Sequence, residues 1–135
     1  MMRKINMEFD MKENCYFYKA LVTKVIDGDS CVADIDLGFG IKTSKTKIRL
    51  NGIDTAEIKA QDKELKEKAN IAKQLLKTMI EGKEVYLRSH GVDKYGRSLA
   101  TIYTLDGLCC NDEMKRKNLA INYDGGTKNQ ELLKG

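Results

Sequence analysis

The first third of the chain alternates apolar and polar residues in the way that predicts β-strands. Residues 16–26 are rich in β-branched and aromatic side chains and end at Asp27-Gly28, a dipeptide typical of a hairpin turn. In residues 31–37, Cys31, Ala33, Ile35 and Leu37 alternate with Asp34 and Asp36, and a third strand is expected over 41–51. The apolar positions of these two strands predict an inward face made of Cys31, Ala33, Ile35, Leu37, Ile48 and Leu50, with Lys47 and Arg49 on the opposite face.

A helical period replaces the strand pattern in the middle of the chain. From about Asp62 to Ile80 the apolar residues recur at spacings of four and three, which predicts an amphipathic helix that ends before Gly82. Two further strands are expected at 84–89 and 98–104. The apolar stripe of the helix consists of Leu65, Ala69, Ala72, Leu76, Met79 and Ile80.

The C-terminal part of the chain predicts two short helical segments. The first covers residues 111–117 and is followed by Asn118, a residue type that tolerates the left-handed conformation just after a helix. Thr127 and Gln130 have the spacing of a capping box, which predicts a last helical turn over 128–134.

The order of these elements predicts an α+β fold with a mainly β core. Three strands, one long helix, two more strands and short C-terminal helices are typical of a five-stranded OB-type Greek-key barrel. In this arrangement the long helix lies between strands three and four. The chain contains no repeat or linker, so we expect a single domain over 1–135, with 1–15 as a peripheral N-terminal extension.

Composition is that of an ordinary globular domain. The 135 residues are 41% hydrophobic and 33% charged, with neither Pro nor Trp, which excludes collagen-like and Pro-rich chains. No apolar run is long enough to cross a bilayer, so no membrane association is expected. Residues 1–14 lack the apolar core of a secretory signal, which makes the cytoplasm the default expectation and leaves export open. We expect a monomer.

Charge and cysteine content narrow the candidate chemistry. The 24 Lys and Arg residues against 20 Asp and Glu residues give a net charge of +4, which permits a phosphate-rich partner without requiring one. The four cysteines have no CxxC spacing and His90 is the only histidine, so a zinc site of the usual kind is excluded. Any Ser-His or Cys-His dyad would depend on His90. The adjacent Cys109 and Cys110 are expected to be reduced thiols.

Three polar clusters contain candidate catalytic residues, and each also has a purely structural explanation. Residues 26–30, Ile-Asp-Gly-Asp-Ser, hold two acids that a hairpin turn would explain. Residues 49–57 include Asp54 and Glu57 between a strand and a helix, where helix capping is the alternative. Residues 93–97, Asp-Lys-Tyr-Gly-Arg, are equally typical of a charged turn.

Taken together, the clusters resemble the staphylococcal nuclease, or thermonuclease-like, family. The resemblance extends from about residue 17 to residue 123, and the order and separation of its fragments match the family. It is based on VIDGDS at 25–30, IRLNGIDTAE at 48–57, DKYGR at 93–97 and CNDEMKRKNLA at 110–120.

This resemblance implies a Ca²⁺-dependent phosphodiesterase on an OB-type barrel. Asp29 and Asp54 take the positions of calcium carboxylates, and Thr55 takes the position whose main-chain carbonyl joins the metal. Glu57 takes the place of the proposed general base beside the attacking water. Calcium binds six to eight oxygens, so this ligand set leaves room for water and for a substrate phosphate.

The resemblance also implies the residues that bind substrate. Arg49 and Arg97 match the two phosphate-binding arginines, and Lys94 and Tyr95 match residues that contact the phosphate end of the nucleotide. Tyr123 matches one of the late tyrosines near the nucleotide. Arginine suits such a site because its planar donors can bind two oxygens at once and stabilise charge in the transition state.

The implied activity is hydrolysis of single-stranded DNA, RNA or both, by attack of water at phosphorus, giving 3′-phosphate and 5′-hydroxyl ends. The alternative is a catalytically weak or inactive OB-type module that binds nucleic acid or protein. The acidic cluster favours the enzyme, because carboxylates repel phosphate in a site that only binds. A calcium-binding regulator is disfavoured, because the chain has no EF-hand spacing.

The chain departs from the family at two places. Ala56 stands where the family has proline, so we expect a more mobile loop before Glu57. The hairpin over 33–48 is longer than in the family's best-known member.

Overall fold

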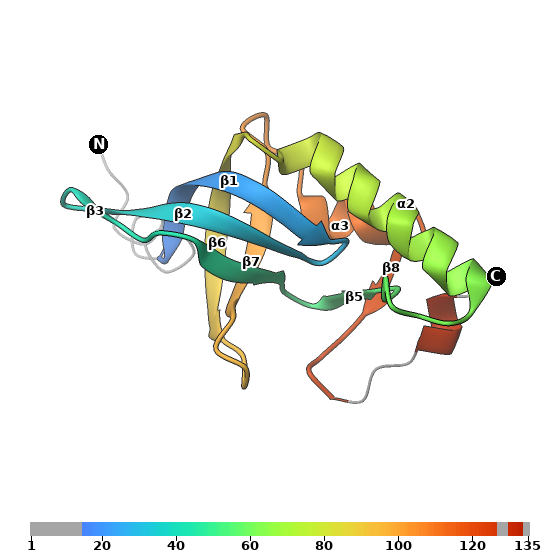
Figure 1. Cartoon of the computed structure of the whole chain (residues 1–135). Helices are drawn as coiled ribbons and strands as arrows, with labels where there is room; N and C mark the ends of the chain where they lie inside the picture. Colours follow the sequence, from blue (N-terminus) through green and yellow to red (C-terminus); the bar gives the residue numbers. More distant parts are fainter. Residues whose placement is uncertain (1–14, 127–129, 134–135) are drawn as a thin grey trace, which may run out of the picture.

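A computed structural model describes residues 15–126 and 130–133 and contains a small barrel with one long helix across its end (Figure 1). The strands are β1 (Phe17–Asp27), β2 (Ser30–Gly38), β3 (Ile41–Lys42), β4 (Thr46–Leu50), β5 (Ile53–Thr55), β6 (Glu84–Val92), β7 (Ser98–Tyr103) and β8 (Ala120–Asn122). The helices are α2 (Lys63–Ile80), α3 (Cys110–Arg116) and the 3₁₀ turn η1 (Gln130–Leu133).

Five strands close the barrel in the order β1-β6-β7-β4-β2, and the pairing of β1 with β2 completes the circle. β4 and β7 run parallel, with Arg49 opposite Leu99, while the other pairs of the barrel are antiparallel. This closed mixed barrel with its helices confirms the predicted OB-type α+β fold. The predicted division into one domain with a peripheral extension stays a prediction, because residues 1–14 lie outside the described part of the chain.

The core lies inside the barrel and beneath α2. The Asp62 side chain accepts a hydrogen bond from the Leu65 amide at 3.1 Å and caps the start of α2, so the predicted helix is confirmed almost to the residue. The helix stripe packs against the strands, which removes its apolar surface from water and is the dominant favourable contribution to folding. Its buried members are Leu65, Ala69, Ala72, Leu76 and Ile80, while Met79 is half-buried.

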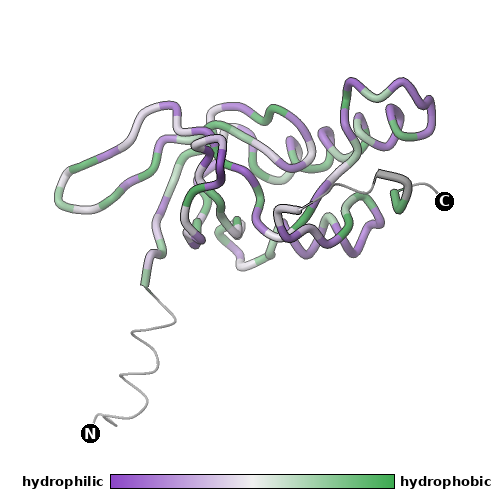
Figure 2. Tube along the Cα trace, turned by 90° about the horizontal axis from the view of Figure 1, so that it is seen from below, coloured by the Kyte–Doolittle hydropathy of each residue, from purple (hydrophilic) through white to green (hydrophobic). Residues whose placement is uncertain are grey.

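The strand predicted over 41–51 is wrong as a continuous element, because the segment between β3 and β4 leaves the ladder. Lys45 has φ of 52° there, and its amide donates to the Asp34 carboxylate at 2.8 Å. As a result β2 and β3 form an arm that projects from the barrel, with pale and green segments at its tip (Figure 2). Leu37, predicted to face the core, is therefore 41% exposed.

Two strands of three residues each were not predicted from the sequence. β5 and β8 pair with each other in a small separate sheet, with Asp54 opposite Ile121. The predicted 84–89 strand is longer and ends at Val92. Asn118 has φ of 59°, as predicted for the residue after α3. The predicted final turn is present as η1, whereas the capping-box residue Thr127 lies outside the described residues.

Candidate active site

Arg49 lies at the centre of the candidate site. Its Nη1 is 3.4 Å from Asp29 Oδ2 and its Nη2 is 3.2 Å from Asp54 Oδ1, while Nη1 also donates to the Leu50 carbonyl at 3.2 Å. Arg49 is only 3% exposed, although the sequence placed it on the polar face of its strand. A buried guanidinium needs charge and hydrogen-bond partners, and these three groups provide them.

Two separate elements present the carboxylates to Arg49. Asp29 lies in the turn between β1 and β2, and Asp54 is the middle residue of β5 and fully buried. The Thr55 amide donates to Asp29 Oδ2 at 3.1 Å, which ties the turn to β5. The short strand missed by the sequence analysis is therefore the element that fixes the second carboxylate.

Gly28 allows the turn to lie directly against the helix. A Cβ at this position would be 2.6 Å from the Ala72 Cβ and 3.0 Å from the Thr55 Oγ1. Real Cβ atoms essentially never approach so closely, so only glycine fits without displacing α2 or β5. The backbone between the two acids of this turn thus rests on both neighbouring elements.

Asp27 and Asp29 form a coupled acidic pair. Asp27 Oδ1 accepts hydrogen bonds from the Asp29 amide at 3.1 Å and from the Ser30 hydroxyl at 2.6 Å. Burial, together with the neighbouring Asp27, raises the pKa of Asp29 to about 7, against the opposing effect of Arg49. Burial also raises the pKa of Asp27, but hydrogen bonds from Asp29 and Ser30 outweigh it and leave that pKa below its usual value. The raised pKa of Asp29 thus reflects burial first and its acidic neighbour second.

Glu57 follows β5 and is exposed at the edge of a cavity of about 350 Å³. Asp27, Asp29, Arg49 and Arg97 line the same cavity. This places a carboxylate, the acidic pair and two guanidiniums around one space, as general acid-base chemistry on a phosphate would require.

Ala56 holds the backbone just before Glu57. Its side chain is 2% exposed and belongs to a small buried cluster with Leu65, Ala69 and Leu133. Packing of this methyl group against α2 and η1 takes the place of the fixed φ that a proline would supply. The expected greater mobility of this loop stays a prediction.

The turn between β6 and β7 is organised by Asp93. Its Oδ1 accepts from the amides of Tyr95 and Arg97, both at 2.9 Å, and its Oδ2 accepts from Arg97 Nε at 2.8 Å. These bonds hold the pKa of Asp93 below its usual value, although burial raises it. The Arg97 guanidinium and the Lys94 ammonium both lie 5.4 Å from the centre of the Tyr95 ring.

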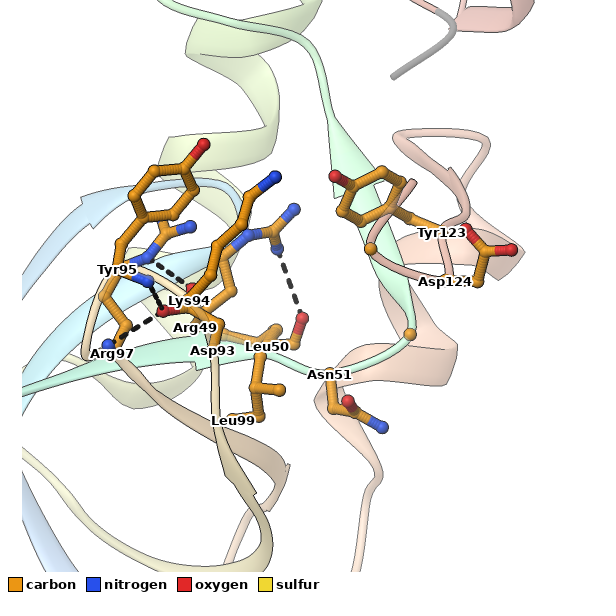
Figure 3. A pocket seen from close by; sticks show the side chains of 12 residues that line it. Arg49, Leu50, Asn51, Asp93, Lys94, Tyr95, Arg97, Leu99, Tyr123 and Asp124 are labelled. Atoms are coloured by element: carbon orange, nitrogen blue, oxygen red, sulfur yellow. Dashed lines mark hydrogen bonds and ion pairs between the residues drawn. The ribbon is translucent and has the colours of Figure 1, made fainter. Parts of the chain in front are cut away.

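A second cavity, of about 430 Å³, adjoins the first and shares Arg49 and Arg97 with it. Lys94 and Tyr95 line one side and Tyr123 lines the other, with Arg49 between them (Figure 3). The Arg49 guanidinium lies 5.5 Å from the centre of the Tyr123 ring. Aromatic rings beside guanidiniums suit a ligand with both a phosphate and a flat base.

All nine predicted site residues lie in or beside these two cavities: Asp29, Arg49, Asp54, Thr55, Glu57, Lys94, Tyr95, Arg97 and Tyr123. The roles assigned to them stay predictions. The sequence analysis missed Asp27 as the partner of Asp29 and Asp93 as the anchor of Arg97. The two-residue spacing of the acids in Asp-Gly-Asp and the four-residue spacing from Asp93 to Arg97 are signals that could have found them.

The donors fit a hard cation in kind. Asp29, Asp54 and the Thr55 carbonyl offer oxygen ligands only, the kind that Ca²⁺ binds, and both carboxylates lie beside Arg49. Within 15–126 and 130–133, no three His, Cys, Asp or Glu side chains group as a metal cage. A cation here would thus depend on main-chain, water and substrate oxygens.

Comparison with known proteins agrees with this arrangement. The family model described as staphylococcal nuclease homologue matches residues 47–134, a range that includes Arg49, Asp54, Glu57 and Arg97. The chain belongs to this family. It is 33% identical over 98 residues to a rice (Oryza sativa subsp. japonica) protein described as "Probable staphylococcal-like nuclease CAN1". The match covers 72% of this chain but only 27% of the rice protein.

A Ser-His or Cys-His dyad would have to use His90. His90 Nε2 is 2.7 Å from the Thr101 hydroxyl, and neither cavity is lined by His90. None of Cys15, Cys31, Cys109 and Cys110 forms a disulfide in the described part of the chain, and the reduced state of the adjacent pair stays a prediction. In the described part of the chain, no helix is both long and apolar enough to span a bilayer.

Proposed function

We propose that this nuclease-family chain is a Ca²⁺-dependent phosphodiesterase that hydrolyses single-stranded DNA, RNA or both. The observation that supports this most strongly is the cavity shared by Glu57, Asp29, Arg49 and Arg97. A general base, a carboxylate ligand and two guanidiniums around one space are what hydrolysis of a phosphodiester needs.

The two arginines bind and orient the scissile phosphate. Arg97 is anchored through Nε by Asp93, so its terminal nitrogens can face the cavities. Arg49 is held by the carboxylates and by Leu50, which fixes its plane before substrate arrives. Guanidiniums fixed in advance stabilise charge that develops on the equatorial oxygens without reorganising during the reaction.

Glu57 accepts the proton of the attacking water. The water oxygen forms a bond to phosphorus in line with the 5′ oxygen, and the bond from phosphorus to that oxygen breaks. The leaving oxygen takes a proton from solvent, so the products are a 3′-phosphate and a 5′-hydroxyl. The exposed position of Glu57 leaves its carboxylate accessible to solvent.

Asp29, Asp54 and the Thr55 carbonyl are the groups that would hold calcium. Bound there, calcium would supply positive charge to a phosphate oxygen and lower the cost of the negative charge in the transition state. Asp27 supports this arrangement through the Asp29 amide.

The dimensions of the site favour a single strand. Arg49 is almost completely buried, and the adjoining cavity of about 430 Å³ is flanked by Tyr95 and Tyr123. A flexible strand can bring one phosphate to such a guanidinium and place an unpaired base near the rings, where it can stack. The four cysteines, none of which forms a disulfide in the described residues, support a reducing compartment such as the cytosol.

The direct test is cleavage of end-labelled single-stranded DNA and RNA with calcium, with excess chelator, and with calcium restored. We expect cleavage only in the first and third conditions, and faster cleavage of single strands than of a duplex of the same sequence. Circular dichroism with chelator should show a folded protein, because the barrel core and α2 do not include the proposed ligands. Undiminished cleavage in chelator would refute the calcium requirement. Nucleic-acid binding without cleavage in any condition would favour a binding module.

A further inference from the structure

The tip of the β2–β3 arm exposes an unusual amount of apolar surface. Phe39 is 102% exposed, Ile41 is 56% exposed and Leu37 is 41% exposed. Each of these exposed side chains is separated from the next by a glycine, so the tip has no polar side chain of its own. Apolar groups gathered on a projecting element typically mark a contact with another molecule.

The turn conformation is a second reason why a phenylalanine at the tip is unexpected in a chain that binds nothing there. Gly38 pairs with Ile41, so Phe39 and Gly40 form a two-residue hairpin loop, with φ of 56° and 74°. Such loops prefer Asn or Gly at the first position, because both central residues need positive φ. A bulky side chain there is uncommon. A phenylalanine at position 39 therefore adopts a disfavoured backbone conformation and exposes its whole ring to water. These two costs point to a role in binding.

A mostly apolar cavity lies at the base of the same arm. It has a volume of about 240 Å³ at the open end of the barrel. Apolar cavities of about 150 Å³ are large enough to take a benzene ring, so this one can take the side chain of a phenylalanine. Its lining includes Tyr18, Ile35, Leu37, Ile48, Leu87 and Ser89.

We propose that the chain forms a two-fold symmetric dimer in which Phe39 of each copy fills the barrel-end cavity of the other. Leu37 lines the cavity and precedes Phe39 by two residues, so the inserting ring and the receiving cavity lie close together on one molecule. That placement allows both contacts to form at once in a self-complementary interface. The monomer expected from the sequence is replaced by this proposal.

Charge on the arm favours a second copy over an anionic partner. Residues 34–47 contain three lysines and two aspartates, a difference of one charge. Asp36 lies opposite Lys42 in the β2–β3 pairing, so acidic and basic groups alternate across the arm. Nearly balanced charge gives little attraction to nucleic acid or to an anionic membrane, whereas two such arms can match each other.

The tip of the arm lies at the far end of β2 from the proposed active site, although the receiving cavity shares Leu99 with the cavity of about 430 Å³. β2 begins beside Asp29 and ends at Gly38, and a nine-residue strand spans about 30 Å. Substitutions at the tip should therefore alter association without altering the reaction at each site.

Sedimentation velocity over a range of protein concentrations tests the proposal. The wild-type chain of 135 residues should dimerise, and Phe39→Ala should weaken the dimer by about 10²- to 10⁴-fold, because two phenyl rings lose their burial. Ile71→Ala on α2 removes another exposed apolar side chain, 57% exposed, and should leave the dimer unchanged. Both variants should keep the wild-type melting temperature at concentrations where every protein is monomeric.

A second variant tests the receiving cavity. Ser89→Leu adds an apolar side chain at the cavity lining and should weaken the dimer as Phe39→Ala does. A mixture of the two variants should associate more strongly than either alone, because Phe39 of one can enter the intact cavity of the other. A wild-type monomer at every concentration would overturn the proposal. A dimer insensitive to Phe39→Ala, or a mixture no stronger than its components, would overturn it as well. So would a monomer that binds anionic phospholipid vesicles through Phe39.

Discussion

Replacing Arg97 with lysine separates the charge of this residue from the geometry of its donors. Arg97 Nε donates to Asp93 at 2.8 Å, and within the described residues its terminal nitrogens make no hydrogen bond. The guanidinium can therefore hold its anchor and a phosphate at the same time. Lysine has a single ammonium group, which must leave Asp93 to reach the phosphate or stay and lose it.

The expected effect is large on rate and small on stability. Loss of one preorganised donor to transition-state charge costs about 10²- to 10³-fold in kcat. The ion pair with Asp93 is partly exposed, with the Arg97 side chain 32% accessible, and exposed pairs contribute about 0 to 1 kcal/mol to stability. Arg97→Lys should therefore reduce the melting temperature by a few degrees at most.

The assay is steady-state cleavage of a short single-stranded oligonucleotide in calcium, with thermal unfolding of the same samples. Arg116→Lys on α3 is a matched control, because Arg116 Nε also pairs with a carboxylate, that of Glu113, and lines neither cavity. We expect wild-type turnover for Arg116→Lys. Wild-type turnover for Arg97→Lys would refute the reasoning and leave residues 93–97 as a charged turn.

Three other variants test separate parts of the site. Glu57→Gln should lower kcat by about 10²- to 10⁴-fold with no loss of folding, and wild-type turnover would remove Glu57 from the mechanism. Gly28→Ala should destabilise the fold by about 1 to 3 kcal/mol in denaturant titration, because the new Cβ meets Ala72 and Thr55, and an unchanged midpoint would contradict that packing. The lowered pKa of Asp93 gives the folded state stability that is present above pH 3.8 and is lost as the pH falls through that lowered pKa. The melting-temperature difference between wild type and Asp93→Asn should therefore be largest near neutral pH and disappear in acid, and a difference independent of pH would count against it.

The sequence predicted those parts of the fold in which one periodicity extends over many residues. The apolar stripe from Leu65 to Ile80 keeps a consistent spacing over about four turns. Asp62 precedes the helix, and the structure begins α2 at the next residue. The prediction of one continuous strand over 41–51 was wrong because the break between β3 and β4 depends on a contact from β2. There the Lys45 amide donates a hydrogen bond to Asp34. No local pattern of residues 43–45 contains that information.

In the candidate site, too, features that depend on local sequence were predicted, and features that depend on distant contacts were not. The polar clusters were visible as residue types, but the burial of Arg49 was not. On β4 alone, Arg49 alternates with Ile48 and Leu50 and so belongs to the polar face. It becomes buried because Asp29 and Asp54 arrive from a turn and from β5, and β5 is too short for its period to be recognised. Tyr123 could be placed near the nucleotide only through resemblance, whereas the structure sets its ring beside Arg49.

The parallel pairing of β4 with β7 has a consequence for how the protein folds. It joins residues 48–50 to residues 98–100, so about fifty residues must be ordered or looped out before this contact forms. Arg49 lies within this pairing, and Arg97 directly precedes it. The two guanidiniums can meet only when the barrel closes. Onset of cleavage during refolding should therefore not precede the pairing of β4 with β7, and it should lag behind the formation of α2.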